Sequence, residues 1–434
     1  MPIPKHLSLT IPDSDLPRIV IIGGGFGGLK LAKGLRKAKA QVVLLDRNNF
    51  HTFQPLLYQV ATAGLEPDSI AGPLRKSFEG NPNYFFRMVK VTGIDAAKNE
   101  IETAVGNLSY DYLVIANGSV TNYFGNDEMK KKVLPLKRIV HALNLRSHIL
   151  QNFEQAVLTK DQSKLQQMMN IVVVGGGPTG VEVCGALSEL KKHILPKDYP
   201  DLDFSQMSIH LIEGTGRLLN GMSDASGENS LKYMERLGIN VKLNTRVEGY
   251  ENDVVQLSDG SIESSTVIWS AGVRGNILDG MDASSIERSR ILVDEFNRVK
   301  GSDNIFAIGD VALMQTKDSP NGHPMLAPVA MQQGTHLAAN FKKYFKEKEM
   351  QPFKYLDKGS MATIGKNKAV VDMPGGFHVK GLLAWLIWMF IHILYLIGFR
   401  NKLIALNNWV WSYLTYDKGT RLIIRTFNRN SSKS

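Results

Sequence analysis

The sequence RIVIIGGGFGGLKLAKGL, residues 18–35, sets the architecture of the N-terminal part of this 434-residue chain. Residues 19–22 are all isoleucine or valine, which is typical of a buried strand, and the residues after the glycines have the apolar spacing of a helix. Gly23 allows a tight turn, Gly25 lets a pyrophosphate approach the backbone, and Gly28 lets the helix pack closely against the strand. The stretch therefore predicts a strand, a turn and a helix that bind a dinucleotide.

The next strand ends in an acid that such a site needs. Residues 41–45 read QVVLL and lead into Asp46. Its carboxylate is placed to accept hydrogen bonds from the hydroxyls of an adenosine ribose.

The same pattern occurs a second time. Residues 170–187 read NIVVVGGGPTGVEVCGAL, with Gly175, Gly177 and Gly180 at the three glycine positions. One glycine-rich turn is weak evidence, but each of these follows a strand pattern and precedes a helix pattern. We therefore expect two dinucleotide sites in one chain.

The acid of the second site comes late in the sequence. The strand 208–212 ends in Glu213, farther from the glycines than the usual distance of roughly 20 residues, and residues 197–201 are interpreted as an insertion. A carboxylate there accepts hydrogen bonds from the 2′ and 3′ hydroxyls and repels a 2′-phosphate, so we expect NADH rather than NADPH. The alternative is a solvated acid at the end of a strand.

The composition excludes several classes of protein. The chain is 43% hydrophobic, enough for ordinary cores, and its length suggests two or three domains. Cys184 is the only cysteine, so we expect no intrachain disulfide and no metal site. The net charge is +10, yet no basic run is interleaved with aromatic residues, which argues against nucleic acid. Residues 1–6 lack the features of a signal peptide, which predicts residence on the cytoplasmic side.

An uncharged run, residues 381–399, precedes a basic tail. The run is just long enough to span a bilayer, but Lys380 and Arg400 flank it, which disfavours a span. A buried helix of the core or of a dimer interface is a second alternative. We adopt a third, a monotopic anchor in which this run and residues 402–409 lie in one leaflet. The residues expected at the membrane are Trp385, Trp388, Arg400, Lys402, Trp409 and Trp411.

Three further strand patterns suggest how the chain is organised. Residues 110–116 and 265–272 each run into a glycine turn and close the two nucleotide units. Residues 304–310 end in Gly309 and Asp310, and this strand is expected to return to the first unit. One unit is thus inserted in the other.

The order of these motifs resembles that of the two-dinucleotide-binding flavoprotein reductases over nearly the whole chain. The resemblance implies an α/β fold with two Rossmann-like domains of the glutathione-reductase-like kind, one inserted in the other, plus a C-terminal helical membrane anchor. It implies FAD at the first glycine turn, NADH at the second, and contact of Asp310 with the ribityl–phosphate part of the flavin. Asn117 replaces a threonine common there.

The resemblance also assigns domains and site residues. The expected domains are residues 1–125 with 295–345 for FAD, 126–294 for NADH, and 346–434 for membrane anchoring and the quinone side. The residues expected at FAD are Gly23, Gly25, Phe26, Gly27, Gly28, Asp46, Arg47, Ala116, Gly118, Gly309, Asp310, Ala327 and Pro328. Those expected at NADH are Gly175, Gly177, Thr179, Gly180, Glu182, Glu213, Ala271 and Gly272.

Which reductase the chain resembles depends on its cysteine and on local sequence. A single cysteine cannot form the redox-active pair of disulfide reductases and sulfide:quinone reductases. Residues 49–61, 178–182, 271–274 and 357–365 strongly resemble type II NADH:quinone oxidoreductases. That resemblance implies a respiratory enzyme without proton pumping, usually a homodimer, monotopic on the cytoplasmic face of the cell inner membrane. It would pass electrons from NADH through FAD to a membrane quinone, which we expect to be menaquinone.

Two alternatives stay open. One is an NADH-dependent reductase of a soluble electron carrier such as ferredoxin or rubredoxin. The other is a non-catalytic, FAD-bound interaction protein that senses redox state.

The quinone-side motif of the resembled family, Ala-Gln-x-Ala-x-Gln-Gln, is matched by residues 327–333, APVAMQQ. Pro328 stands at the first glutamine and has neither a side-chain amide nor a backbone N–H. Gln332 and Gln333 are therefore the residues expected to contact quinone, with Gln332 in a catalytic role.

Glu182 is the second expected catalytic residue. It resembles the family's acid that assists nicotinamide placement or proton delivery. An acid in a first helical turn is stabilised as a carboxylate by the helix macrodipole, which lowers its pKa unless burial opposes it. His51 and His392 are interpreted as structural histidines.

Overall fold

The structure, a computed structural model, describes residues 7–428, and these form two compact units. The first contains the described residues up to His51, together with Gly72–Val120 and Val273–Asp357; the second contains Thr52–Ala71, Thr121–Gly272 and the described chain from Lys358 onward. Residues 1–6, on which the signal-peptide argument rests, lie outside the described residues. Each unit has its own parallel sheet, as expected from the two repeated motifs.

The first unit is built on a five-stranded sheet whose strands are all parallel. Its order is β22 (Ile305–Ala307), β9 (Tyr112–Ile115), β1 (Arg18–Ile22), β2 (Gln41–Asp46) and β5 (Tyr84–Met88). The pairing of β22 with β9 confirms that the late strand returns to the first sheet. Ile19, Val20 and Ile21 are fully buried, which explains why β1 reads as a continuous apolar run.

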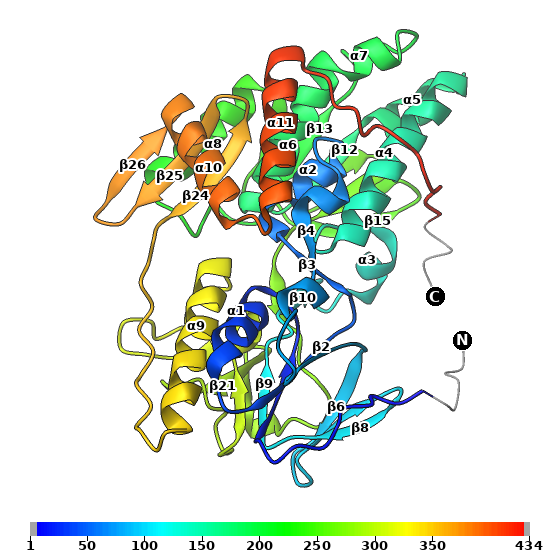
Figure 1. Cartoon of the computed structure of the whole chain (residues 1–434). Coiled ribbons are helices and arrows are strands. Elements are labelled where there is room, and N and C mark those ends of the chain that lie inside the picture. The colour runs from blue at the N-terminus through cyan, green and yellow to red at the C-terminus, as the bar shows by residue number, and fades with distance from the viewer. Residues whose placement is uncertain (1–6, 429–434) are drawn as a thin grey trace. The chain divides into compact units, whose positions relative to one another are not determined.

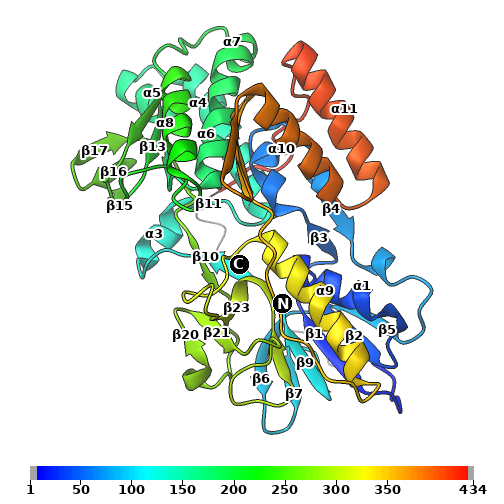
Figure 2. The same cartoon turned by 90° about the vertical axis from the view of Figure 1, so that its left-hand side faces the viewer.

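Helix α1 (Phe26–Gly34) packs against α9 (Ala327–Tyr344), and Figures 1 and 2 show the two side by side. The backbones approach so closely that a Cβ added at Gly334 would overlap the Gly27 carbonyl. Small residues at this crossing therefore bring the N-terminal end of α9 close to the first glycine turn.

Smaller antiparallel and mixed ladders complete the first unit. They are β6 (Val91–Asp95), β7 (Glu100–Thr103) and β8 (Gly106–Ser109), and β20 (Ile286–Glu287), β21 (Arg290–Val293) and β23 (Ala312–Met314). Two short ladders contain the points at which the chain crosses between units: β3 (Phe50–Thr52) with β4 (Ala71–Pro73), and β10 (Ser119–Thr121) with β19 (Val273–Gly275).

The second unit repeats the architecture of the first. Its parallel sheet has the order β11 (Leu134–Pro135), β18 (Thr266–Trp269), β12 (Ile171–Val174), β13 (Ile209–Ile212) and β14 (Ile239–Lys242). The antiparallel ladder β15 (Val247–Glu251), β16 (Val254–Leu257) and β17 (Gly260–Glu263) precedes β18. The helices are α2 (Leu57–Ala61), α3 (Asp127–Lys132), α4 (Ile139–Leu158), α5 (Gln162–Met169), α6 (Pro178–His193), α7 (Leu195–Asp198) and α8 (Asp224–Arg236).

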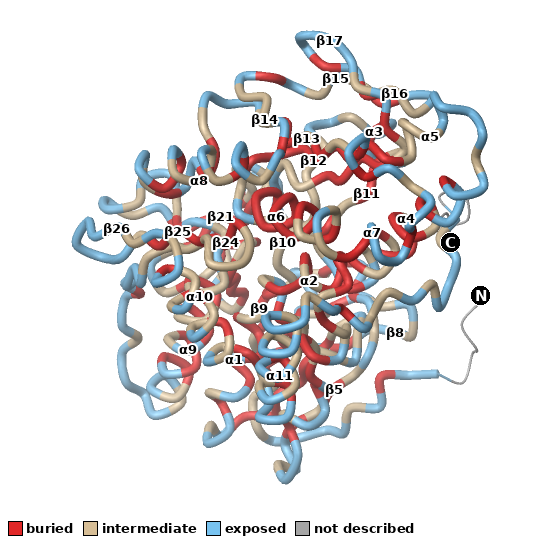
Figure 3. The backbone as a smooth tube through the Cα atoms, turned by 90° about the horizontal axis from the view of Figure 1, so that it is seen from above, coloured by how far each residue is buried: buried red, intermediate tan, exposed pale blue. Residues whose placement is uncertain are grey.

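The C-terminal part packs on α6 within the same unit. It consists of β24 (Ser360–Gly365), β25 (Lys368–Met373), β26 (Phe377–Lys380), α10 (Leu382–Tyr395) and α11 (Phe399–Thr415). A Cβ at Gly185 would overlap the Ile364 carbonyl, so α6 lies directly against β24. Figure 3 shows α6 as buried along most of its length. The C-terminal part thus belongs to the same compact unit as the second sheet. The expected domains, in contrast, treat residues 346–434 as a separate region.

The uncharged run does not form one helix. Helix α10 ends at Tyr395 and α11 begins at Phe399, because Leu396 is extended and Gly398 adopts a φ of +86°. Across residues 7–428 we find no helix with both the length and the apolarity needed to cross a membrane.

Candidate functional site

The first glycine turn combines crowded and open positions. Gly23 has a φ of +107°, and a Cβ at Gly28 would overlap the Gly23 carbonyl, so neither position accepts a larger residue. At Gly25 the nearest heavy atom to an added Cβ is 4.0 Å away, which leaves the backbone open to a ligand. Asp46 Oδ2 accepts a hydrogen bond of 2.7 Å from Gly24 N, and its Oδ1 accepts one from Asn48 N. The turn and its acid therefore fit the adenosine pyrophosphate part of FAD.

The other residues predicted at FAD gather around this turn within the first unit. Gly118 and Gly309 have positive φ values of 70° and 75°. Asp310 Oδ2 accepts a 2.5 Å hydrogen bond from Ser119 Oγ. Ala116 is buried, and its carbonyl would collide with a Cβ added at Gly23. Phe26 contacts the His51 ring edge-on, and Arg47 is exposed after β2. Ala327 and Pro328 are half-buried at the start of α9.

The two glutamines of the quinone-side motif have structural partners that the sequence does not reveal. Gln333 is 1% exposed, and its Oε1 accepts a 2.7 Å hydrogen bond from Gly309 N. Gln332 exchanges two hydrogen bonds with the backbone of Leu356, at 2.9 and 3.0 Å. Gln333 thus positions the Gly309 turn, and Gln332 holds the segment after α9. Their contact with quinone stays a prediction.

Pro328 occupies a position that suits proline. It lies in the first turn of α9, where a backbone N–H has no helical partner to lose. The substitution is therefore compatible with the helix.

The second glycine turn repeats the geometry of the first. Gly175 has a φ of +105°, and a Cβ at Gly180 would overlap the Gly175 carbonyl, whereas nothing lies within 4 Å of a Cβ at Gly177. Glu213 Oε2 accepts a 2.6 Å hydrogen bond from Gly176 N, as Asp46 does in the first unit. The late acid of the sequence therefore stands at the usual place.

The closing strand of this unit supports the second turn. Ser270 Oγ donates to Val174 O at 2.8 Å, and an added Cβ at Gly175 would collide with Ala271. Gly272 has a φ of +104°. Thr179, half-buried, lies in the first turn of α6. The residues predicted at NADH thus surround one loop, with the exception of Glu182, which lines a separate cavity.

Glu182 lies on a buried face of α6, 8% exposed, in a cavity of about 100 Å³. Its lining includes Trp385 and Trp388 of α10 and Trp409 of α11, together with charged residues such as Glu189 and Lys366. Burial raises the pKa of Glu182 well above its ordinary value, and the Thr363 backbone N–H and the Trp388 indole only partly oppose that rise. Burial therefore outweighs these hydrogen bonds and favours the protonated form of Glu182. Glu182 lies beyond the first turn of α6, so the expected effect of the helix macrodipole on this acid is small.

Tyr58 is a polar residue near this acid to which the sequence analysis assigns no role. It is 6% exposed and lines the same cavity. Burial raises the pKa of its hydroxyl, and the charge of Glu182 adds to that effect. Gln59 Nε2 donates to the Tyr58 hydroxyl at 2.9 Å, and Trp409 Nε1 donates to Gln59 Oε1 at 2.7 Å.

The residues expected at the membrane fall into two groups. Trp411 is 58% exposed, and Arg400 is exposed and pairs with Asp68 at 3.5 Å. Lys402 and Trp385 are half-buried. Trp388 is 2% exposed and stacks on His392, so its predicted contact with lipid is wrong. Its indole belongs to the cavity beside Glu182, to which Trp409 also turns.

The two histidines have structural partners. His51 Nδ1 lies 2.9 Å from Gly24 O, and His392 Nδ1 lies 2.7 Å from Trp388 O. Burial lowers the pKa of each imidazole to about 4, so both rings are neutral at physiological pH. Within residues 7–428 no group of three or more His, Cys, Asp or Glu side chains is arranged to hold a metal ion.

Comparison with known proteins agrees with this geometry. A family model described as pyridine nucleotide-disulphide oxidoreductase matches residues 17–334, and one described as NDH2 C-terminal domain matches residues 358–416. A type II NADH:quinone oxidoreductase, Ndh, of Mycobacterium tuberculosis is 35% identical over 93% of this chain and 89% of its own length. A second one from that organism, NdhA, is 33% identical over 94% and 89%.

A solved structure shows the same fold. NDH2 from Plasmodium falciparum in complex with NADH matches with a TM-score of 0.86 at 22% identity, over 94% of this chain and 100% of the other. The paired glycine turns, the C-terminal part and the identity to the mycobacterial proteins lead to one assignment. The chain belongs to the family of type II NADH:quinone oxidoreductases.

Proposed function

We propose that this chain, with FAD as its bound cofactor, oxidises NADH and reduces a quinone. One observation carries the proposal: each unit has an open glycine turn with a strand-end acid bonded to its second glycine, Gly24 N to Asp46 at 2.7 Å and Gly176 N to Glu213 at 2.6 Å. Two such sites suit two dinucleotides. The names of the relatives, type II NADH:quinone oxidoreductase, supply the reaction.

The reaction consumes one proton: NADH, a proton and a quinone give NAD⁺ and a quinol. Bound FAD supplies the redox chemistry, because it accepts a hydride and gives up an electron pair. The protein binds the nucleotides and orients them for the reaction. Asp46 and Glu213 hold ribose hydroxyls, and the open backbone at Gly25 and Gly177 admits the pyrophosphates.

Glu182 is proposed as the carrier of that proton. Burial favours the protonated form of its carboxyl, which lines a cavity that Trp385, Trp388 and Trp409 also line. A neutral acid in such a site donates a proton to an oxygen that gains charge. This role requires the Glu182 carboxyl to lie within hydrogen-bonding distance of a quinone oxygen.

We also propose that α10 and α11 bind to one leaflet of the cytoplasmic membrane. Both helices expose apolar side chains: Leu382, Leu383, Leu386, Phe390 and Leu394 on α10, and Phe399, Leu403, Leu406, Val410, Trp411 and Leu414 on α11. Exposed Arg400 stands beside them, where it would meet anionic headgroups. A surface of this kind would bring the protein to quinone dissolved in the membrane.

An anaerobic experiment tests the reaction. NADH is added to the purified protein, and the absorbance of oxidised flavin is followed until it is lost. A menaquinone analogue is then added. We expect fast bleaching and fast recovery; bleaching without recovery would contradict quinone as the acceptor and favour a soluble carrier or an interaction protein.

A further inference from the structure

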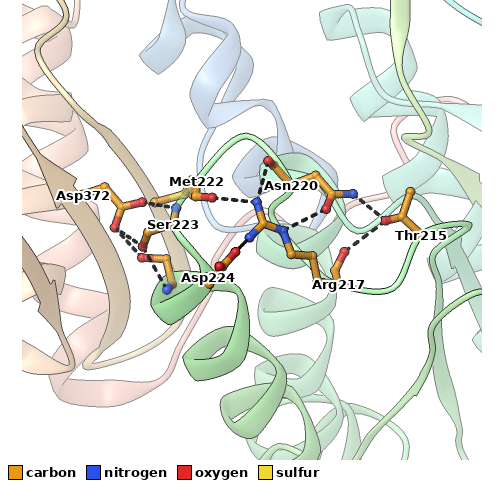
Figure 4. A network of polar contacts seen from close by, with 8 residues as sticks. Thr215, Arg217, Asn220, Met222, Ser223, Asp224 and Asp372 are labelled. Atoms are coloured by element: carbon orange, nitrogen blue, oxygen red, sulfur yellow. Dashed lines mark hydrogen bonds and ion pairs between the residues drawn. The ribbon is translucent and has the colours of Figure 1, made fainter. Parts of the chain in front are cut away.

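In the loop that follows Glu213, the side chain of Arg217 is bound by residues 220–224 of the same segment. Figure 4 shows Arg217 turned into its own loop. Its Nε donates to Asn220 Oδ1 at 3.0 Å, and its Nη2 donates to the carbonyls of Asn220 and Met222 at 2.9 and 3.0 Å. Its Nη1 forms an ion pair with Asp224. These contacts use four of the five N–H groups that a guanidinium offers.

This arginine is linked to the acid that is proposed to bind the ribose. Thr215 Oγ donates to Glu213 Oε1 at 2.7 Å, and Thr215 N donates to the same oxygen at 2.9 Å. Asn220 Nδ2 in turn donates to Thr215 Oγ at 2.5 Å. One threonine and one asparagine therefore separate the Arg217 guanidinium from the carboxylate of Glu213.

The position matters because the 2′ substituent of the ribose distinguishes the two nicotinamide nucleotides. Sites for NADPH use an arginine near the strand end to accommodate the 2′-phosphate, and sites for NADH use an acid. A guanidinium binds phosphate through parallel N–H donors. In this chain both residue types are present, but the donors of the arginine are occupied within the loop.

We infer that Arg217 is a latent binding residue for a 2′-phosphate, and that its capture by Asp224 and Asn220 is a second determinant of selectivity for NADH beside Glu213. The inference rests on the proposed function of the second unit as the nucleotide site. The capture is reversible by small changes, because the Arg217 and Asp224 side chains are 35% and 87% exposed. Ion pairs this exposed contribute little to folding.

The far end of the loop is fixed independently of Arg217. Ser223 N and Ser223 Oγ donate to Asp372 of β25 at 2.6 and 2.9 Å, and Ser226 N donates to Ser223 Oγ at the start of α8. Replacing Asp224 by asparagine leaves these contacts in place. The substitution therefore removes the charge that holds the guanidinium, so that its remaining contacts are those to Asn220 and Met222, and it keeps the anchor of the loop.

The experiment compares nucleotide binding to four forms of the full-length, FAD-loaded protein. The four forms are the unmodified chain, the single variant Glu213→Gln and the double variant Glu213→Gln with Asp224→Asn. The fourth is the triple variant, which also carries Arg217→Met. The dissociation constants of NAD⁺ and NADP⁺ are measured by calorimetry, and the rates of flavin reduction by NADH and NADPH by stopped flow. Binding of the oxidised nucleotides reports on the site without turnover.

We expect the double variant to bind NADP⁺ about tenfold more tightly than Glu213→Gln alone, the effect of one freed charge-assisted contact. NAD⁺ binding should stay the same in both. Adding Arg217→Met should remove the gain. The gain should also weaken at high salt, because it is a charge interaction.

A matched control removes a charge from the same helix. Glu228 is an exposed acid of α8 that faces Lys232 at 4.0 Å and does not touch Arg217. Glu228→Gln in the Glu213→Gln background should leave NADP⁺ binding unchanged. An equal gain from this control would show that net charge, and not the release of Arg217, is responsible.

Two further results would overturn the inference. NADP⁺ binding that is equal in the single and double variants would show that Arg217 does not reach the phosphate. A gain that survives Arg217→Met would assign the phosphate to another cation, such as exposed Arg246, whose Cγ lies 3.7 Å from a Cβ built at Gly214. Failure of the proposed function is distinct, because the unmodified protein would then bind neither nucleotide.

Discussion

Asp372→Asn tests how the C-terminal sheet holds the nucleotide unit. The Asp372 carboxylate accepts four hydrogen bonds: from Ser223 N at 2.6 Å, Ser223 Oγ at 2.9 Å, Ser226 Oγ at 2.6 Å and His378 Nδ1 at 2.8 Å. Asparagine has nearly the same shape but only one acceptor atom. If the asparagine oxygen faces the hydroxyls of Ser223 and Ser226, the amide nitrogen faces the Ser223 backbone N–H. The Ser223 N–H then has no acceptor.

The cost follows from these contacts. Hydrogen bonds to a charged group contribute about 1.5–3 kcal/mol each, and the substitution weakens at least two of them, so we expect a loss of about 2–4 kcal/mol. The Asp372 side chain is 15% exposed, which limits screening by solvent. For a domain of 150–250 residues, 1 kcal/mol lowers the melting temperature by about 2–4 °C. We therefore expect a decrease of about 5–10 °C in the melting of this unit.

Calorimetry measures the melting, and hydrogen exchange measures where the effect lies. Exchange should rise at the start of α8 and in β25, and remain unchanged in the sheet of the first unit. Asp259→Asn is the control, since Asp259 pairs with Lys242 at 2.8 Å on the surface, with 47% of its side chain exposed. A melting temperature within about 1 °C of the unmodified protein, with unaltered exchange, would refute the reasoning.

The effect also has a defined pH dependence. Burial alone would raise the pKa of Asp372, but the hydrogen bonds from Ser223, Ser226 and His378 outweigh it and lower the pKa from 3.8. A lowered pKa in the folded state stabilises the protein above 3.8, and this contribution disappears as the pH falls through the folded value. The difference in stability between the two proteins should therefore shrink below about pH 4.

The other predictions concern the nucleotide, the buried acid and the membrane face. Glu213→Gln should raise the ratio of kcat/KM for NADPH to that for NADH, and steady-state kinetics with both nucleotides checks this; an unchanged ratio would show that Glu213 does not read the ribose. Glu182→Gln should slow flavin reoxidation by quinone and remove its decline as the pH rises through the raised pKa of the native carboxyl, because only the protonated carboxyl can donate a proton. The same variant should lack the loss of stability that the native protein shows as the pH rises from 4.5 towards the folded pKa, as pH-dependent denaturation will test. Leu386→Lys with Phe390→Lys should reduce co-sedimentation with anionic vesicles, whereas Leu158→Lys, at a site that is 83% exposed on α4, should not; equal sedimentation of both would contradict binding through α10.

Local sequence was sufficient for the repeated core of each unit. The apolar run before Gly23 predicts β1, and the structure places that strand at Arg18–Ile22. The strand after Gly180 and its late acid were also found, because a strand, a glycine turn and a helix depend on neighbouring residues alone. The family of the chain was predicted from the order of these motifs along the sequence and from the local segments that resemble the family.

Long-range packing determined the rest. Sequence periodicity cannot show that Gln333 accepts a hydrogen bond from Gly309, since the two residues are brought together only when α9 packs against the turn that follows β22. For the same reason the pattern placed Trp388 at the membrane, whereas it lies in the cavity beside Glu182.

The sequence by itself determined two glycine turns, two strand-end acids and a C-terminal region rich in apolar and aromatic residues. Only the tertiary structure decided the direction in which the pKa of Glu182 is shifted, because the burial that raises it depends on the packing of β24 and α10 around the carboxyl. It also decided the partners of Arg217, which come from a loop whose two ends are fixed by Glu213 and by a strand far along the chain. Contacts between residues distant in sequence carry no local signal, so they become visible only in the fold.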